Sequence, residues 1–263
     1  ILPAERVKGE PITSRPDLLP PGLSDRYDHT GLLWDTQYGH AELAKFREIL
    51  GSYAYAAQFQ QSPVPREGGI VKLSWFRRYR VPPDKFNSIV LSCDTAQKAA
   101  QLNDPWAILE WGILGKDYYL LSMVCRRYEY PEGKRSILNE VLRWKPSAVL
   151  IEDASSGASL IQEYRQDRSV RISVIPISPC QDKVTRMAVV SPVIEAGRVW
   201  LPENADWVAA YETELTTFPR GSHDDQVDAT SQFLSWADRR SLVPSDRTGI
   251  VEGDRNSRWS GFN

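Results

Sequence analysis

A cluster of acidic residues near position 225 is the feature of this sequence best suited to chemistry. The stretch 221–229 reads Gly-Ser-His-Asp-Asp-Gln-Val-Asp-Ala and contains three aspartates, Asp224, Asp225 and Asp228. Residues three or four apart are surface neighbours on a helix, so Asp228 would lie beside the other two. Like charges this close raise one another's pKa, and a hard divalent cation such as Mg²⁺ is the usual compensation. The spacing therefore indicates a carboxylate metal site on a helix.

The same acids also have a purely structural interpretation. Ser222-x-x-Asp225 has the form of a capping box, and acids in a first helical turn are favoured by the helix dipole. This accounts for Asp224 and Asp225 but not for Asp228, which lies past the first turn and beside an apolar stripe. We predict a helix over 222–238 with Ser222 as its N-cap and His223 as an ordinary helix-entry residue, although His223 could instead orient a water molecule. The stripe that would face the core consists of Val227, Thr230, Leu234 and Ala237.

Composition limits the classes of protein to which the chain can belong. It has 263 residues, of which 41% are hydrophobic, so a full core can form in one large domain or in a domain with an extension. The net charge is −2, so any nucleic-acid binding must depend on a local patch. The three cysteines, Cys93, Cys125 and Cys180, have no CxxC spacing, which excludes a disulfide framework and suits a reducing cytoplasm. No apolar run is long enough for a membrane span, and no signal-peptide pattern precedes Ile1, so we expect a fragment of a longer protein.

From residue 88 onward the pattern predicts a mixed α/β sheet. The first three strands form an antiparallel meander, because Gly115-Lys116-Asp117 is a short hairpin signal. Helices and strands then alternate, which is typical of a sheet with helices on its faces. The predicted strands are 88–93, 106–114, 118–125, 148–151, 170–175 and 199–201, and the predicted helices are 132–144, 155–166, 182–196, 205–217 and 222–238.

The N-terminal third is predicted to be less regular. Five prolines punctuate residues 1–35, so we expect no continuous helix there. Two short helices follow at 41–50 and 53–61, separated by Gly51-Ser52. The basic and aromatic stretch 75–80 is interpreted as a strand or turn with solvated arginines rather than as a base-contacting patch.

Two further acids stand at strand ends. Asp94 follows the strand 88–93, and Glu152 follows the strand 148–151. Each alone could be an ordinary turn residue. Ligands of such sheets bind at the carboxyl ends of the strands, so the two acids would converge if their strands were neighbours. With the aspartates of the last helix they would form a two-metal hydrolytic site, with the ions about 3.5–4 Å apart.

Several short motifs, in order over roughly residues 45–238, resemble the C-terminal part of the large subunit of tailed-phage terminases, which package and cut viral DNA. No single motif is specific, but their combination is. The matching segments are Tyr53–Pro63, Ser92–Ala96, Ile151–Asp153 with Gly157, Asp182–Arg186, Gly197–Pro202 and His223–Ala229.

The resemblance implies an RNase H-like nuclease fold with an acidic triad that binds two Mg²⁺ or Mn²⁺ ions. Asp94 and Glu152 match the first two acids, and the third comes from the last motif, where we assign Asp225 and Asp228 and keep Asp224 as the alternative. In this hypothesis Asp94 bridges both ions, Glu152 holds one, Asp225 and Asp228 hold the other, and water attacks the phosphodiester in line. The expected activity is endonucleolytic cutting of concatemeric viral DNA, with low sequence specificity.

The resemblance also implies a domain organisation and a set of partners. Residues 1–85 would connect to a missing ATPase domain, 86–240 would form the nuclease, and 241–263 would be a flexible tail. The sequence has no G-x-x-x-x-G-K-[ST] pattern, so we expect no ATP site in this chain. The expected partners are double-stranded DNA and, in the full motor, the portal protein and the small terminase subunit, in the cytoplasm of an infected bacterium and without a membrane. The nuclease domain alone is expected to be a monomer.

Two basic residues and two other functions remain open at this point. Lys183 and Arg186 lie one helical turn apart and could contact the DNA backbone, although such a pair is often only a solvated face. A Holliday-junction resolvase or transposase on the same fold is one alternative. The other is an assembly module that docks onto a portal ring and uses its acids to hold a structural ion.

Overall fold

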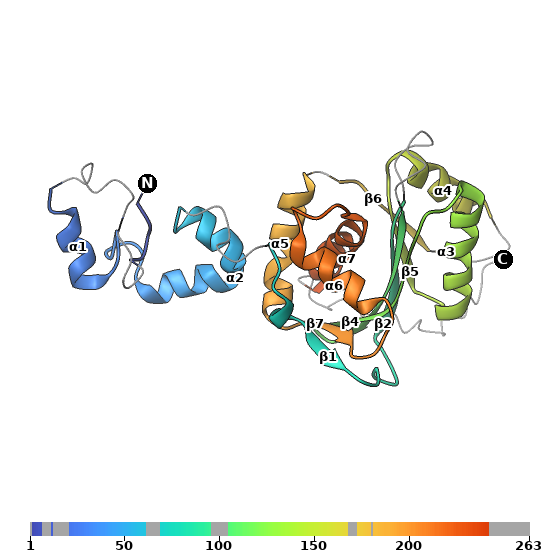
Figure 1. The fold of residues 1–263 in the computed structure, drawn as a ribbon, viewed down its shortest axis with the longest axis horizontal. Helices are drawn as coiled ribbons and strands as arrows, with labels where there is room; N and C mark the ends of the chain where they lie inside the picture. Colours follow the sequence, from blue (N-terminus) through green and yellow to red (C-terminus); the bar gives the residue numbers. More distant parts are fainter. Residues whose placement is uncertain are drawn as a thin grey trace, which may run out of the picture.

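The computed structural model describes residues 2–6, 12, 21–61, 69–95, 105–167, 173–179 and 181–241. Its centre is a seven-stranded mixed sheet with the strand order β1-β7-β4-β3-β2-β5-β6 (Figure 1). The strands are β1 (Arg77–Tyr79), β2 (Ser88–Asp94), β3 (Trp106–Leu114), β4 (Asp117–Arg126), β5 (Ala148–Glu152), β6 (Val174–Ile177) and β7 (Val199–Pro202).

The predicted antiparallel meander is confirmed. β2 pairs antiparallel with β3, and β3 with β4, while β5 joins β2 in parallel and β6 joins β5 in parallel. At the other edge β7 pairs in parallel with both β4 and β1. β2, β3 and β5 are buried over most of their length, as expected for central strands that are covered on both faces.

Helices cover both faces of the sheet, as predicted (Figure 1). One face carries α3 (Tyr130–Trp144) and α4 (Ser155–Gln166), which pack on Leu91, Ile108 and Ile151. The other face carries α5 (Lys183–Glu195), α6 (Val208–Thr217) and α7 (Asp225–Ser241). On that face Trp111 of β3 stacks on Phe233 of α7, with ring centroids 4.6 Å apart, so α7 is anchored over the middle of the sheet.

The N-terminal helices form a separate small cluster around Leu32, Leu43 and Tyr55. The expectation of no regular helix before residue 35 was wrong: α1 spans Leu23–Thr30, because the five prolines all precede it. α2 (His40–Gln58) is kinked at Gly51, where we predicted a break. Gly51 has a φ of 71°, and a Cβ there would lie 2.8 Å from Cγ of Pro192, so a glycine is needed where α2 packs on α5.

Some predicted boundaries shift. α7 begins at Asp225 rather than at residue 222, α6 at Val208 rather than 205, and β6 at Val174 rather than 170. The tail predicted for 241–263 lies outside the described residues except for Ser241, as do Cys180 and the ends of the motifs at Ala96 and Ser62-Pro63. No helix among the described residues combines the length and the apolar character needed to cross a bilayer.

The basic stretch before residue 81 forms strand β1 together with a short 3-10 helix (Leu73–Trp75). Its arginines are engaged within the protein: Arg78 pairs with Glu212, and Arg80 pairs with Glu203 at 2.7 Å. The guanidinium of Arg77 lies 5.3 Å from the ring centroid of Trp200. The interpretation of this stretch as a strand rather than as a base-contacting patch therefore agrees with the structure.

One buried acid, Glu110 of β3, lies on the sheet face that α3 covers. Its side chain is fully buried, and neither carboxyl oxygen has a hydrogen bond that meets the usual geometry within the described part of the chain. Burial and the charge of Glu140 raise its pKa to about 9, while Ser122 and Arg143 act in the opposite direction. The Cys93 thiol also lies within range of its charge. Glu110 is therefore a neutral acid at pH 7.

We expect this acid to make stability depend on pH. The unfolded chain releases the proton near pH 4.5, whereas the folded chain keeps it until about pH 9. Stability should therefore fall as pH rises through this window, by at most about 1.4 kcal/mol per pH unit. Glu110→Gln, which is neutral at every pH, should reduce this slope in urea denaturation at pH 6, 7 and 8. The exposed-pair variant Glu203→Gln serves as the control, and a wild-type slope in Glu110→Gln would contradict the assignment.

Candidate active site

The two strand-end acids lie side by side at one edge of the sheet. β2 and β5 are parallel neighbours, with Cys93 opposite Ile151, so Asp94 and Glu152 follow at adjacent strand ends. The Glu152 side chain is buried, and Asp94 is partly buried. The condition on which the prediction of convergence depended, that the two strands be neighbours, is therefore met.

The start of α4 helps to place Glu152. A Cβ on Gly157 would lie only 2.1 Å from the carbonyl oxygen of Glu152, so α4 can pass this close to the strand end only with glycine at that position. Ser156 donates a hydrogen bond of 3.1 Å to the Thr95 hydroxyl, which joins the start of α4 to the end of β2. These contacts give Gly157, one of the motif residues, a physical role.

The start of α7 is capped from another helix. Glu214 of α6 is buried, and its Oε1 accepts hydrogen bonds from the backbone nitrogens of Gln226 (2.7 Å) and Val227 (3.3 Å). Its Oε2 accepts from the Gln226 side chain at 2.6 Å. Ser222, the predicted N-cap, is exposed and lies before the helix begins, so that assignment was wrong. A local motif search misses a cap that comes from outside the helix.

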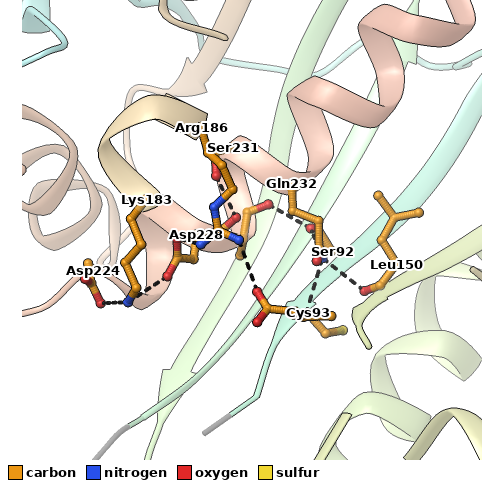
Figure 2. A network of polar contacts seen from close by, with 11 residues as sticks. Ser92, Cys93, Leu150, Lys183, Arg186, Asp224, Asp228, Ser231 and Gln232 are labelled. Carbon is orange, nitrogen blue, oxygen red and sulfur yellow. Dashed lines mark hydrogen bonds and ion pairs between the residues drawn. The ribbon is translucent and has the colours of Figure 1, made fainter. Parts of the chain in front are cut away.

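Buried hydrogen bonds fix α7 across the seam between β2 and β5. Ser92 donates to the carbonyl of Ala229 at 2.7 Å. The Gln232 amide donates to Ser92 Oγ at 3.0 Å and to the carbonyls of Cys93 (3.3 Å) and Leu150 (3.4 Å), as Figure 2 shows. Gln232 lies one turn after Asp228, so these contacts hold the acidic end of α7 beside the strand ends. Neither Ser92 nor Gln232 was predicted as a site residue, although a glutamine among the buried positions of α7 is a sequence signal.

The structure brings four of the predicted acids together. Burial raises the pKa of Asp94 well above its ordinary value, and the negative charges of Asp228, Glu152 and Asp225 raise it further. Asp228 is 5% exposed, and burial raises its pKa as well. Such mutual repulsion shows that the four carboxylates share one region of low solvent access.

Two cations from α5 face this cluster. Lys183 Nζ lies 2.7 Å from Asp224 Oδ1 and 2.8 Å from Asp228 Oδ2. Arg186 lies 2.6 Å from Asp228 Oδ1 and 3.3 Å from Glu152 Oε2 (Figure 2 labels Lys183, Arg186 and both aspartates). Burial alone would lower the pKa of Lys183, but its hydrogen bonds to Asp224 and Asp228 raise it overall. The two residues predicted to contact DNA therefore pair with the acids in this structure.

The chemistry of the cluster fits a hard divalent cation, whose preferred ligands are carboxylate oxygens. Asp94 has surplus negative charge around it and forms no ion pair with any described residue. The acids are nevertheless not arranged as a finished ligand set: over the described residues, no three His, Cys, Asp or Glu side chains converge at metal-ligand geometry. Both oxygens of Asp228 face cations instead. His223 is exposed.

A mixed sheet of this order, with acids at the ends of neighbouring strands and at the start of the last helix, defines an RNase H-like domain. The profile of the terminase RNaseH-like domain family matches residues 91–236, more than half of the chain. The chain therefore belongs to the terminase RNase H-like domain family, and its fold is that of a large-terminase nuclease domain.

Solved structures agree on the fold. The large terminase of a thermophilic bacteriophage, in complex with ADP, superposes with a TM-score of 0.57 at 14% identity, over 81% of this chain and 57% of that one. The large terminase nuclease of the thermophilic phage G20c with bound magnesium superposes with a TM-score of 0.50 at 12% identity, over 65% of this chain and 98% of that one. Across several structures of the first of these terminases, the chain spans between 52% and 58% of that protein. No protein with a curated description matches the sequence.

The cap on α7 yields a test of how the site is built. Glu214→Ala would leave the buried nitrogens of Gln226 and Val227 without an acceptor, so we expect a loss of stability of about 1–3 kcal/mol in urea denaturation. Glu203→Ala, which removes a surface partner of Arg80, should change stability by less than about 1 kcal/mol. Equal effects of the two variants would show that the cap does not hold the start of α7.

Proposed function

We propose that this chain is a divalent-metal-dependent DNA endonuclease, the nuclease part of a terminase large subunit that cuts concatemeric viral DNA during packaging. The observation that carries the proposal is the convergence of Asp94, Glu152, Asp225 and Asp228 in a domain of the terminase RNase H-like family. The magnesium in the G20c nuclease structure supports the choice of cofactor.

The residues divide the work by position. Asp94 lies centrally among the acids, so we assign it to bridge two Mg²⁺ or Mn²⁺ ions, with Glu152 on one side and Asp225 and Asp228 on the other. The bound ions would supply activation of water and neutralisation of the phosphate charge. The raised pKa of Asp94 means that its carboxyl tends to keep a proton while no cation is present, and ligation would release that proton.

The expected substrate is double-stranded DNA, recognised by its backbone and therefore with low sequence specificity. Within a packaging motor the portal protein and the small terminase subunit are the proposed partners, and the proposed location is the cytoplasm of an infected bacterium. We assign no ATP hydrolysis to this chain, because its sequence contains no P-loop pattern. Residues 1–85 are proposed as the connection to an ATPase domain.

Digestion of supercoiled plasmid tests the activity and its acids together. With Mg²⁺ or Mn²⁺ the purified chain should nick and linearise the plasmid without sequence preference, and EDTA should abolish cutting. Asp94→Asn and Asp228→Asn should each lose on the order of 100-fold or more in rate, because each removes a charged ligand. Asp238→Asn is the matched control, since Asp238 lies on the same helix and pairs with Arg198 at 3.3 Å.

The same assay separates the alternative functions. Cutting that strongly prefers a four-way junction to linear duplex would favour a resolvase on this fold. Full activity in Asp94→Asn would contradict the assigned acids, and the absence of cutting with either metal would favour a domain that only docks or one that needs an ATPase partner.

A further inference from the structure

The two basic residues of α5 occupy the acid on which metal binding would depend. Asp228 has two carboxylate oxygens, of which Oδ1 faces Arg186 at 2.6 Å and Oδ2 faces Lys183 at 2.8 Å. A divalent cation on Asp228 would bring two or more positive charges within a few ångströms of each other, and such contacts are repulsive. At least one of these ion pairs must therefore open before a cation can bind Asp228.

The two cations differ in how easily they can leave. Arg186 is buried with a side-chain exposure of only 17%, and it bridges Glu152 and Asp228, which are 9% and 6% exposed. Withdrawing it would leave two buried carboxylates without their counter-charge, which is strongly unfavourable. Its planar guanidinium also has the fork of donors suited to holding two carboxylates at once.

Lys183 has the opposite character. Its side chain is 42% exposed, and its second partner, Asp224, is 38% exposed. It is the first residue of α5, directly after the N-cap Asp182, which accepts a hydrogen bond from the Thr185 nitrogen at 3.0 Å. The helix is therefore capped without help from Lys183, and its flexible side chain can turn into solvent without breaking any backbone contact.

We propose that Lys183 is an exchangeable counter-ion of the acidic cluster, which neutralises Asp224 and Asp228 until a divalent cation displaces it. Arg186 stays in place and positions Glu152 and Asp228. The displaced ammonium remains at the mouth of the site, where it can contact a phosphate of the substrate, so the arrangement of cations would change when metal and DNA enter together. This inference rests on the proposed metal-dependent function.

Competition makes a thermodynamic prediction that requires no DNA and no turnover. A ligand that must displace an internal cation binds less tightly than one that meets a free carboxylate. Lys183→Met keeps the aliphatic length but removes the charge, so it should bind Mn²⁺ about 3- to 10-fold more tightly than the wild type, a range set by the strength of a partly exposed ion pair. Lys183→Arg should retain an affinity near that of the wild type.

Isothermal titration of Mn²⁺ into the DNA-free chain measures this, with thermal unfolding in EDTA and in Mn²⁺ as a second readout. Lys134→Met is the matched control: Lys134 also pairs with a partly exposed carboxylate, Glu163, at 2.5 Å, but on the α3 and α4 face of the sheet. It should leave Mn²⁺ affinity unchanged, whereas Lys183→Met should also show a larger rise in Tm on adding Mn²⁺.

The outcomes separate this inference from the proposed function. If the wild type binds Mn²⁺ and Lys183→Met binds it equally or more weakly, the exchange is wrong while the metal site stands. If neither protein binds Mn²⁺, or if binding persists unchanged in Asp94→Asn, the cation does not use this cluster, and both the inference and the assigned site are overturned. Tighter binding in Lys183→Met alone among the lysine variants supports the exchange.

Discussion

The site depends on the hydrogen bonds that fix α7 on the seam between β2 and β5. A buried amide must find partners, and the Gln232 amide finds its acceptors within the two strands whose ends carry Asp94 and Glu152. Together with the bond from Ser92 to the Ala229 carbonyl, these contacts specify how α7 is rotated and how far it extends. A shift of α7 by one residue would break them and would turn Asp228 away from the strand ends.

Charge is the second constraint, and α5 satisfies it. Four carboxylates in a partly buried space destabilise one another, and the compensation comes from two cations on the first turns of a single helix. The far end of α5 contacts α2, where Glu195 accepts a hydrogen bond of 2.8 Å from the Ser52 nitrogen beside the kink at Gly51. One helix therefore touches both the acidic cluster and the N-terminal helices (Figure 1).

The sequence predicted the sheet better than it predicted the contacts within the site. Alternating apolar runs and a hairpin signal suffice for the β2-β3-β4 meander, and parallel β5 follows from its helical crossover, so Asp94 and Glu152 could be placed at strand ends. The partners of Lys183 and Arg186 could not be predicted, because they depend on how α5 packs against α7. The cap by Glu214 is equally non-local, since it crosses from α6 to α7.

The structural and the functional interpretations of the acids at the start of α7 turn out to be compatible. Asp224 and Asp225 lie where the positive end of the helix dipole favours negative charge, so their placement costs the fold little. Glu214 meanwhile accepts the hydrogen bonds of the first free nitrogens, a task that a capping box would have assigned to the side chains of this stretch. Because capping is provided from α6, Asp224 is left to pair with Lys183, and the carboxylate of Asp225 is left to add its charge to the cluster around Asp94. A helix end that needed its own acids for capping could not also present them to a cation.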